Sequence, residues 1–338
     1  LNAKGLETPK LFEIPEDDKP IGVDEFPLFY KFSGQGQFSR FPKAVLEDEP
    51  YPVRGLMILG GSPVLSFPDS KSWREAYKKL DCLIVLDRYF TEDARYADVV
   101  FPACSLFEVP KAVPGPEGPH IVEPLIEPVG ESKNDVLIMG TIAKKLGFGD
   151  KLPQTEEELR SWLLSGTASY AGDFGTSADQ KKEKHYKKYE TGELRADGKP
   201  GFPTPSGKLE ICSTILEENG FVPYPEYKDV RSIPELAGKE YPFTMTSGAR
   251  SNNRMGVFGA NLDKIAEIEP YPFVDINAED AKEIGIKDGD MVKVITPFAD
   301  GTFKAKIRGI VRHAIHIPHG GGSAYMAEPW KNGNVNDL

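Results

Sequence analysis

The residues best suited to hold an anionic ligand follow one predicted strand in the last third of the chain, within YPFTMTSGARSNNRMG (241–256). After the alternating strand come small, polar and cationic residues: Ser247, Gly248, Arg250, Ser251, Asn252 and Asn253. Glycine lets a ligand approach the backbone, a guanidinium forms paired hydrogen bonds with an anion, and hydroxyl and amide groups add donors. The same residue types build ordinary surface turns, so this stretch alone is compatible with either an anion-binding loop or a turn.

A second candidate site lies where two predicted strands end in the first half of the chain. Gly60, Gly61 and Ser62 follow an apolar run, and Asp87 follows another. In doubly wound sheets, ligands bind at the carboxyl ends of the strands. Glycines there admit a nucleotide, although the pair is not the G-x-G-x-x-G pattern of nicotinamide binding.

Asp87 has two interpretations. A carboxylate at a strand end can accept hydrogen bonds from a ribose or a purine edge, or it can cap local structure in contact with solvent. Thr91 and Asp98 follow Asp87 closely in the sequence, and their side chains could either complete a binding pocket or cap local structure.

The histidines and cysteines give little support for a metal site. His313, His316 and His319 are spaced H-x-x-H-x-x-H, which in a strand turns the first two to opposite faces. His319 precedes three glycines, and its imidazole could either contact a ligand or have a purely structural role at the end of a strand. The cysteines are far apart and form no C-x-x-C, so we expect reduced, mostly buried thiols and no cluster: Cys82, Cys104 and Cys212.

Composition bounds the class of protein. A chain of 338 residues favours two domains, and the net charge of −11 argues against nucleic acid or an anionic membrane as a partner. No apolar run approaches the roughly 20 residues of a membrane helix. The first residues contain neither Met nor an apolar signal core, so localisation stays open between cytoplasmic and exported.

The elements that must position the candidate residues differ between the two halves. In the first half we expect strands at 55–61, 81–87 and 97–103 and helices at 69–79 and 135–146. This strand–helix repetition predicts a layered α/β domain.

In the second half, short strands predominate, and they favour a closed barrel. We expect strands at 241–247, 271–277, 290–297, 302–309 and 314–320. Asp288-Gly289 and Asp300-Gly301 are turn signals. Asn277 is a plausible N-cap of one helix that Gly285 ends.

Six segments in order resemble the carboxyl half of the molybdenum or tungsten oxidoreductases that bind bis(molybdopterin guanine dinucleotide), the dimethyl sulfoxide reductase family. They are PYPVRGLMILGGSPVLSFPDS (50–70), LDCLIVLDRYFTEDARYADVVFPACSLFE (80–108), FPTPSGKLEI (202–211), TMTSGARSNN (244–253), PFVDINAEDAKEIGIKDGDMVKV (272–294) and PHGGG…WKNGNVNDL (318–338). Each segment alone is weak evidence for the resemblance, but six segments in the family's order are specific evidence for it.

The resemblance implies a fold of type α/β plus β. A Rossmann-like layered α/β domain that binds dinucleotide would cover 51–150, and a six- or seven-stranded β-barrel of double-psi type would cover 205–338. Residues 1–50 would be an irregular segment packed on domains outside this sequence, and residues 151–204 a polar connector.

The resemblance also implies which residues touch the cofactor. Together with Thr91, the predicted contacts are Gly61, Ser62, Asp87, Asp135, Ser247, Gly248, Arg250, Ser251, Asn252, Asn253, His319, Gly320 and Asn336. Ser62-Pro63 stands where the family usually has Asn-Pro, and Ser-Gly-Ala-Arg stands where it usually has Thr-Gly-Arg.

By the same resemblance, the chain is part of an oxidoreductase of anaerobic respiration, with Mo or W on a bis-molybdopterin guanine dinucleotide. The iron–sulfur motif and the metal ligand would belong to amino-terminal domains outside this sequence, so the chain alone would not be catalytic. Those domains and an electron-transfer iron–sulfur subunit are the expected partners. Two alternatives stay open: a separate subunit that only clamps the cofactor, and an unrelated two-domain nucleotide binder.

Overall fold

The computed structural model describes residues 19–113, 115, 118–174, 187–233, 240–248, 262–326, 330–331 and 333–338. They divide into two compact units. The described part of the first unit comprises Val23–Gly36 and Phe101–Glu226, and the second unit comprises Lys19–Gly22, Gln37–Val100 and Tyr227–Leu338.

The α/β part of the second unit is built on a three-stranded sheet in the order β1-β2-β3. Its strands are β1 (Gly55–Leu59), β2 (Cys82–Asp87) and β3 (Val99–Pro102), the last of which runs across the boundary into the first unit. β1 and β2 are parallel, with Leu59 beside Leu86. The short helix α3 (Pro63–Ser66) and helix α4 (Ser70–Lys79) join these two strands. The predicted strand–helix–strand pattern is therefore confirmed at this coarse level.

Helix α4 forms because its start is capped and one face is apolar. The Asp69 carboxylate accepts a hydrogen bond from the Ser72 N–H at 3.2 Å, which satisfies one of the open donors of the first turn. Trp73, Ala76 and Tyr77 recur at helical spacing and are all buried. They are part of the larger of two apolar cores in the second unit.

The predicted irregular segment at 1–50 differs from the structure in its described part. It contains α1 (Pro27–Ser33), the 3-10 turn η2 (Phe38–Arg40) and α2 (Phe41–Glu47). Phe41 stacks on Trp73 with ring centroids 5.6 Å apart, and Phe38 lies 5.2 Å from the same ring. These aromatic side chains complete the α/β core of the chain itself, because aromatic rings bury large areas when they pack together.

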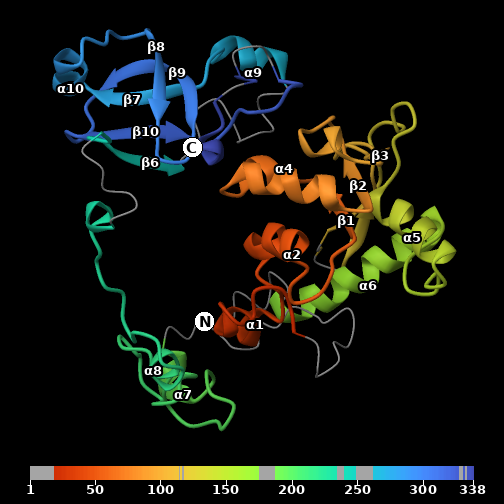
Figure 1. The fold of residues 1–338 in the computed structure, drawn as a ribbon. Coiled ribbons are helices and arrows are strands. Elements are labelled where there is room, and N and C mark those ends of the chain that lie inside the picture. Colours follow the sequence, from red (N-terminus) through yellow and green to blue (C-terminus); the bar gives the residue numbers. More distant parts are fainter. Residues whose placement is uncertain are drawn as a thin grey trace. The chain divides into compact units, whose positions relative to one another are not determined.

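The second sheet has five strands in the order β6-β10-β7-β9-β8 and is curled (Figure 1). Its strands are β6 (Thr244–Gly248), β7 (Phe273–Asn277), β8 (Met291–Ile295), β9 (Asp300–Arg308) and β10 (Ala314–Pro318). β6 pairs with β10, and β7 with β9, in parallel; the other two pairings are antiparallel. Closure into a six- or seven-stranded barrel needs more strands than these five and stays a prediction.

Two local expectations in this half have different outcomes. Asn277 caps α10 (Ala278–Glu283), and Gly285 follows that helix at φ +75°, both as predicted. Asp300 and Gly301, predicted as a turn, instead begin β9 opposite Ile295 and Val294. The turn lies earlier, because the Thr296 N–H donates to the Ala299 carbonyl at 2.9 Å and closes the hairpin there.

The first unit contains the hairpin β4 (Lys111–Val113) and β5 (His120–Val122) and the helices α5 (Asp135–Lys145), α6 (Glu156–Phe174), α7 (Lys188–Thr191) and α8 (Thr214–Glu218). The predicted polar connector therefore contains a long helix, and its Leu159 is fully buried. Most of the charge run at 178–193 lies outside the described residues.

The remaining short elements belong to the second unit: η3 (Asp93–Arg95), η5 (Val230–Ser232), α9 (Asp263–Ile268) and η8 (Val335–Asp337). Among the described helices, none is both long and apolar enough to cross a membrane.

Candidate functional site

The carboxyl ends of β1 and β2 form an open edge. The Gly60 N–H donates to the Leu86 carbonyl at 2.9 Å, which extends the parallel ladder by one residue and sets Gly60 beside Asp87. Gly60 has φ +60°, and among the described atoms nothing lies within 4 Å of where a Cβ at Gly60 or Gly61 would be. A ligand can therefore approach this backbone directly.

Asp87 supplies the charge at this edge. Its carboxylate is half-buried and accepts a hydrogen bond from the Tyr89 N–H at 3.0 Å. Burial raises the pKa of Asp87, and hydrogen bonds from the Tyr89 and Arg88 backbone oppose that rise. The local bond resembles a cap, so both interpretations of Asp87 remain compatible with its geometry. A partly desolvated carboxylate gains from further N–H or O–H donors, such as those of a purine or a ribose.

Ser62 and Thr91 were predicted to contact the cofactor, but little of either residue is accessible to a ligand. Both are buried, and each makes an internal bond. The Ser62 hydroxyl donates to the Asp93 carboxylate, and Thr91 Oγ1 accepts from the Ala94 N–H at 3.3 Å. Asp98 is not part of this edge, because it accepts from the Leu83 N–H near the amino end of β2.

A second open edge lies where β6 and β10 end together. The two strands run parallel, with Gly248 beside Pro318, so the loops that begin after them start side by side. Ser247 and Gly248 close β6, and His319 and Gly320 follow β10. Gly248 has φ +108° with no described atom within 4 Å of a Cβ there. Arg250, Ser251, Asn252 and Asn253 lie outside the described residues.

The polypeptide after β10 connects the two edges within the second unit. Asn336 Nδ2 donates to the Leu65 carbonyl at 2.6 Å, and the Ala324 N–H donates to Glu92 Oε2 at 3.1 Å. The rings of Phe90 and Tyr325 lie 4.8 Å apart. The structure therefore joins the segment with Gly61, Ser62, Asp87 and Thr91 to the segment with His319, Gly320 and Asn336.

Asp135, the remaining predicted contact, lies in the first unit. It is the first residue of α5, whose N-cap is Asn134 with its Oδ1 2.9 Å from the Val136 N–H. A carboxylate there interacts favourably with the positive end of the helix dipole.

A polar cavity of about 560 Å³ lies against the chain after β10. Its charged side chains are balanced, with three cations (Arg74, Arg95 and Lys331) and three acids (Glu92, Asp300 and Asp337). Arg74 pairs with Asp337 at 2.9 Å, and Arg95 pairs with Glu92 at 2.7 Å. The formal charges of these six side chains therefore sum to zero.

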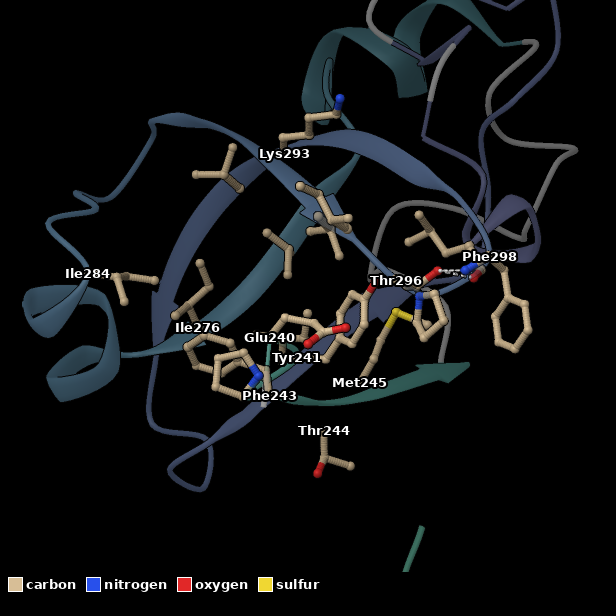
Figure 2. Close-up of a pocket in the computed structure, with 18 of the residues that line it drawn as sticks. Glu240, Tyr241, Phe243, Thr244, Met245, Ile276, Ile284, Lys293, Thr296 and Phe298 are labelled. Atoms are coloured by element: carbon tan, nitrogen blue, oxygen red, sulfur yellow. Dashed lines mark hydrogen bonds between the residues drawn. The ribbon is translucent and has the colours of Figure 1, made fainter. Parts of the chain in front are cut away.

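The larger cavity, about 660 Å³, is apolar and lies on the concave face of the five-stranded sheet, apart from the predicted contacts. Figure 2 shows Met245 and Ile276 turned into it, whereas Thr244 and Lys293 point away. Such a surface is the expected inner face of a sheet that closes on itself.

The three histidines lie at different points along the chain around β10. His313 precedes β10, His316 lies within it with Nδ1 3.1 Å from Thr246 Oγ1, and His319 follows it. In the described part of the chain, no three His, Cys, Asp or Glu residues are grouped to hold a metal. The three thiols are free, but the prediction that they are mostly buried was wrong, because Cys82 and Cys212 are exposed and Cys104 is only partly buried. Cys82 is the first residue of β2, where the strand leaves the core.

Glu92 and Asp93 are the polar residues at this site that sequence reasoning missed. Both are buried in the second unit. The only signal available was a polar run between two predicted strands, and nothing in the sequence distinguishes a buried run from a solvated turn.

Two family models match the chain. The molybdopterin oxidoreductase model matches residues 40–145, and the molydopterin dinucleotide binding domain model matches residues 244–338. The second match includes the end of β6 at Ser247 and Gly248, as well as His319 and Asn336.

Among similar proteins is the F420-dependent formate dehydrogenase subunit alpha of Methanocaldococcus jannaschii, 31% identical over 280 residues, which are 78% of this chain and 39% of that protein. The acetylene hydratase of Syntrophotalea acetylenica is 25% identical over 308 residues, which are 86% of this chain and 40% of that protein.

A solved structure, that of acetylene hydratase from Pelobacter acetylenicus, matches with a TM-score of 0.67 and 23% identity over 84% of this chain and 39% of its own. This chain thus spans about two fifths of the length of these relatives. With both family models matched in order, the chain belongs to the molybdopterin oxidoreductases of the dimethyl sulfoxide reductase family and carries their molybdopterin dinucleotide-binding domain.

Proposed function

We propose that this chain is the carboxyl-terminal portion of a molybdenum or tungsten oxidoreductase and holds the dinucleotide ends of a bis-molybdopterin guanine dinucleotide. One observation carries the proposal. The two segments with predicted contacts, around Asp87 and around His319, are joined within one compact unit by the bond between Glu92 and Ala324. Residues that serve a common ligand must be held together in this way.

The open backbone at Gly60, Gly61 and Gly248 supports this role, because main-chain N–H groups can reach a phosphate where no side chain intervenes. Asp87 would accept hydrogen bonds from a guanine or ribose. His319 would approach the cofactor from the other edge, next to the loop with the predicted contacts Arg250, Ser251, Asn252 and Asn253. When bound, the pterin-held metal supplies the redox or transfer chemistry, and this chain supplies position and electrostatics.

The finer architecture is also part of the proposal. Residues 51–150 would form the Rossmann-like dinucleotide-binding domain, residues 151–204 the connector, and residues 205–338 a double-psi barrel. The apolar concave face of the five-stranded sheet supports barrel closure, since an open face of this kind needs cover.

Substrate and partners are not carried over from the relatives, whose names include both a formate dehydrogenase and a hydratase. We propose amino-terminal domains and an electron-transfer iron–sulfur subunit as partners, and no catalysis by this chain alone. If the chain were instead a separate clamping subunit, the encoded polypeptide would contain no metal-ligating residue upstream of these domains.

The test uses the full polypeptide that contains this sequence, purified without oxygen and assayed for metal, pterin and guanine nucleotide. We expect Asp87→Ala to retain roughly ten- to a hundredfold less cofactor at limiting concentration, as for one lost charge-assisted hydrogen bond. Asp81→Ala is the matched control, because Asp81 lies exposed just before β2 and its carboxylate pairs with the exposed Arg54 at 3.0 Å. Wild-type protein without pterin or guanine nucleotide would refute the proposed function.

A further inference from the structure

Three consecutive polar residues, Thr91, Glu92 and Asp93, are buried at the start of the η3 turn. Glu92 is 2% exposed, and Asp93 is 0% exposed. Burying a carboxylate is costly unless hydrogen bonds compensate for the lost water. The partners of these two side chains therefore indicate what the buried charges do.

Asp93 holds the segment that follows β1. Its Oδ1 accepts from the Val64 N–H at 3.1 Å and from the Tyr77 hydroxyl at 2.7 Å, and its Oδ2 accepts from the Ser62 hydroxyl. Two of these donors, Ser62 and Val64, lie where the loop at Gly60-Gly61 passes into α3, and the proposed function assigns that loop to the dinucleotide. The carboxylate thus fixes the distal end of that loop.

Glu92 holds the segment that follows β10. Its Oε2 accepts from the Ala324 N–H at 3.1 Å, and its Oε1 accepts from Arg95 at 2.7 Å. The neighbouring Phe90 ring packs edge-on against Tyr325. Glu92 and Phe90 therefore fix the distal end of the other proposed cofactor loop, which begins at His319.

From this geometry we infer that Glu92 and Asp93 are positioning residues, which together set the spacing between the loop at 60–62 and the loop at 319–324. The inference rests on the proposed function and deepens it. The two carboxylates are adjacent in sequence, and each accepts hydrogen bonds from a different segment: Asp93 from Ser62 and Val64, and Glu92 from Ala324. The short turn that carries both side chains therefore fixes the two loops relative to each other. A ligand held by both loops tolerates little change in that spacing.

The first experiment measures amide hydrogen exchange in the full polypeptide. Glu92→Ala removes both acceptors, and we expect exchange in a 319–326 peptide to rise roughly ten- to a hundredfold, as for the loss of bonds to a charged group. Glu92→Gln keeps one oxygen for the Ala324 N–H, so its effect should be smaller. Unchanged exchange at 319–326 in Glu92→Ala would overturn the inference whether or not cofactor is bound.

Asp280→Asn is the matched control. Asp280, in α10, is also a buried carboxylate that accepts from one arginine and one backbone N–H. Its partners Arg312 and His313 precede β10, whereas His319 follows the opposite end of that strand. We expect Asp280→Asn to lower the melting temperature and to leave exchange at 319–326 near the wild-type value.

The second experiment measures the rate at which bound pterin is lost on dilution. We expect the order Glu92→Ala fastest, then Glu92→Gln, with Asp280→Asn at the wild-type rate. If wild-type protein holds pterin and Glu92→Ala loses it no faster, the positioning role is refuted and the proposed function stands. Wild-type protein without pterin would refute the proposed function, and the exchange experiment would still decide whether Glu92 fixes the loop.

Discussion

The buried carboxylates of Asp93 and Glu108 accept backbone hydrogen bonds, and their pKa values reflect the balance between burial and bonding. Burial raises the pKa of Asp93, against hydrogen bonds from Ser62, Tyr77 and Val64. In Glu108, hydrogen bonds prevail: those from Ser105 and from the Val129 N–H lower the pKa to about 2. The pKa of one buried carboxylate is therefore raised and that of the other is lowered.

The Glu108 case gives a pH prediction. Its folded pKa is below the ordinary value, so the stability it contributes is present above about pH 4.3 and is lost as pH falls toward about 2. We expect the melting temperature of the wild type to fall more steeply over this range than that of Glu108→Gln. The measurement is thermal unfolding at several pH values, and parallel curves for the two proteins would contradict the assignment.

At the scale of elements, helix α10 shows how local chemistry sets a boundary. Asn277 Oδ1 accepts from the Glu279 N–H at 2.9 Å, and its Nδ2 donates to the Ile310 carbonyl at 2.6 Å. One side chain thus begins the helix and also holds the connection from β9 to β10.

We expect Asn277→Ala to lower the free energy of unfolding by about 1–2 kcal/mol, the usual cost of losing an N-cap. Asn277→Ser retains a capping oxygen but not the bond to Ile310, so it should recover part of that loss. Denaturant unfolding measures both variants. Equal stability of the alanine variant and wild type would show that the cap contributes nothing here.

The predictability of elements differs for a physical reason. Alternation and apolar runs placed every strand of the three-stranded and five-stranded sheets, because strand formation depends on nearby side chains. The hairpin of β4 and β5 was not predicted. The turn predicted at Asp300-Gly301 was wrong because β9 begins there, paired with β8. Aspartate and glycine favour turns, but cross-strand hydrogen bonds and the buried Phe303 outweighed that preference.

At the scale of the whole molecule, exposed apolar side chains gather in the first unit, where backbone bonds join Phe107 to Leu125 and Ile126. Leu125 is 74% exposed and Val129 is 71% exposed. Patches of this kind favour association.

We therefore expect the 338-residue chain to self-associate, and Leu125→Glu with Val129→Glu to shift its elution in sizing experiments toward the monomer. Val311→Glu, which charges a single exposed apolar residue of the second unit, is the control and should not shift it. A monomer for the unchanged chain at micromolar concentration would contradict this expectation.

The sequence by itself determined the family and the nature of the elements, because motifs, caps and periodicity are local properties of neighbouring residues. It also identified Asp87 and His319 as candidates, since both lie at the carboxyl ends of predicted strands. Only the tertiary structure showed that Ser62 bonds inward to Asp93 and that Glu92 holds the N–H of Ala324, which is 232 residues away. Such contacts depend on how distant segments pack, and burial of a polar side chain has no local signature.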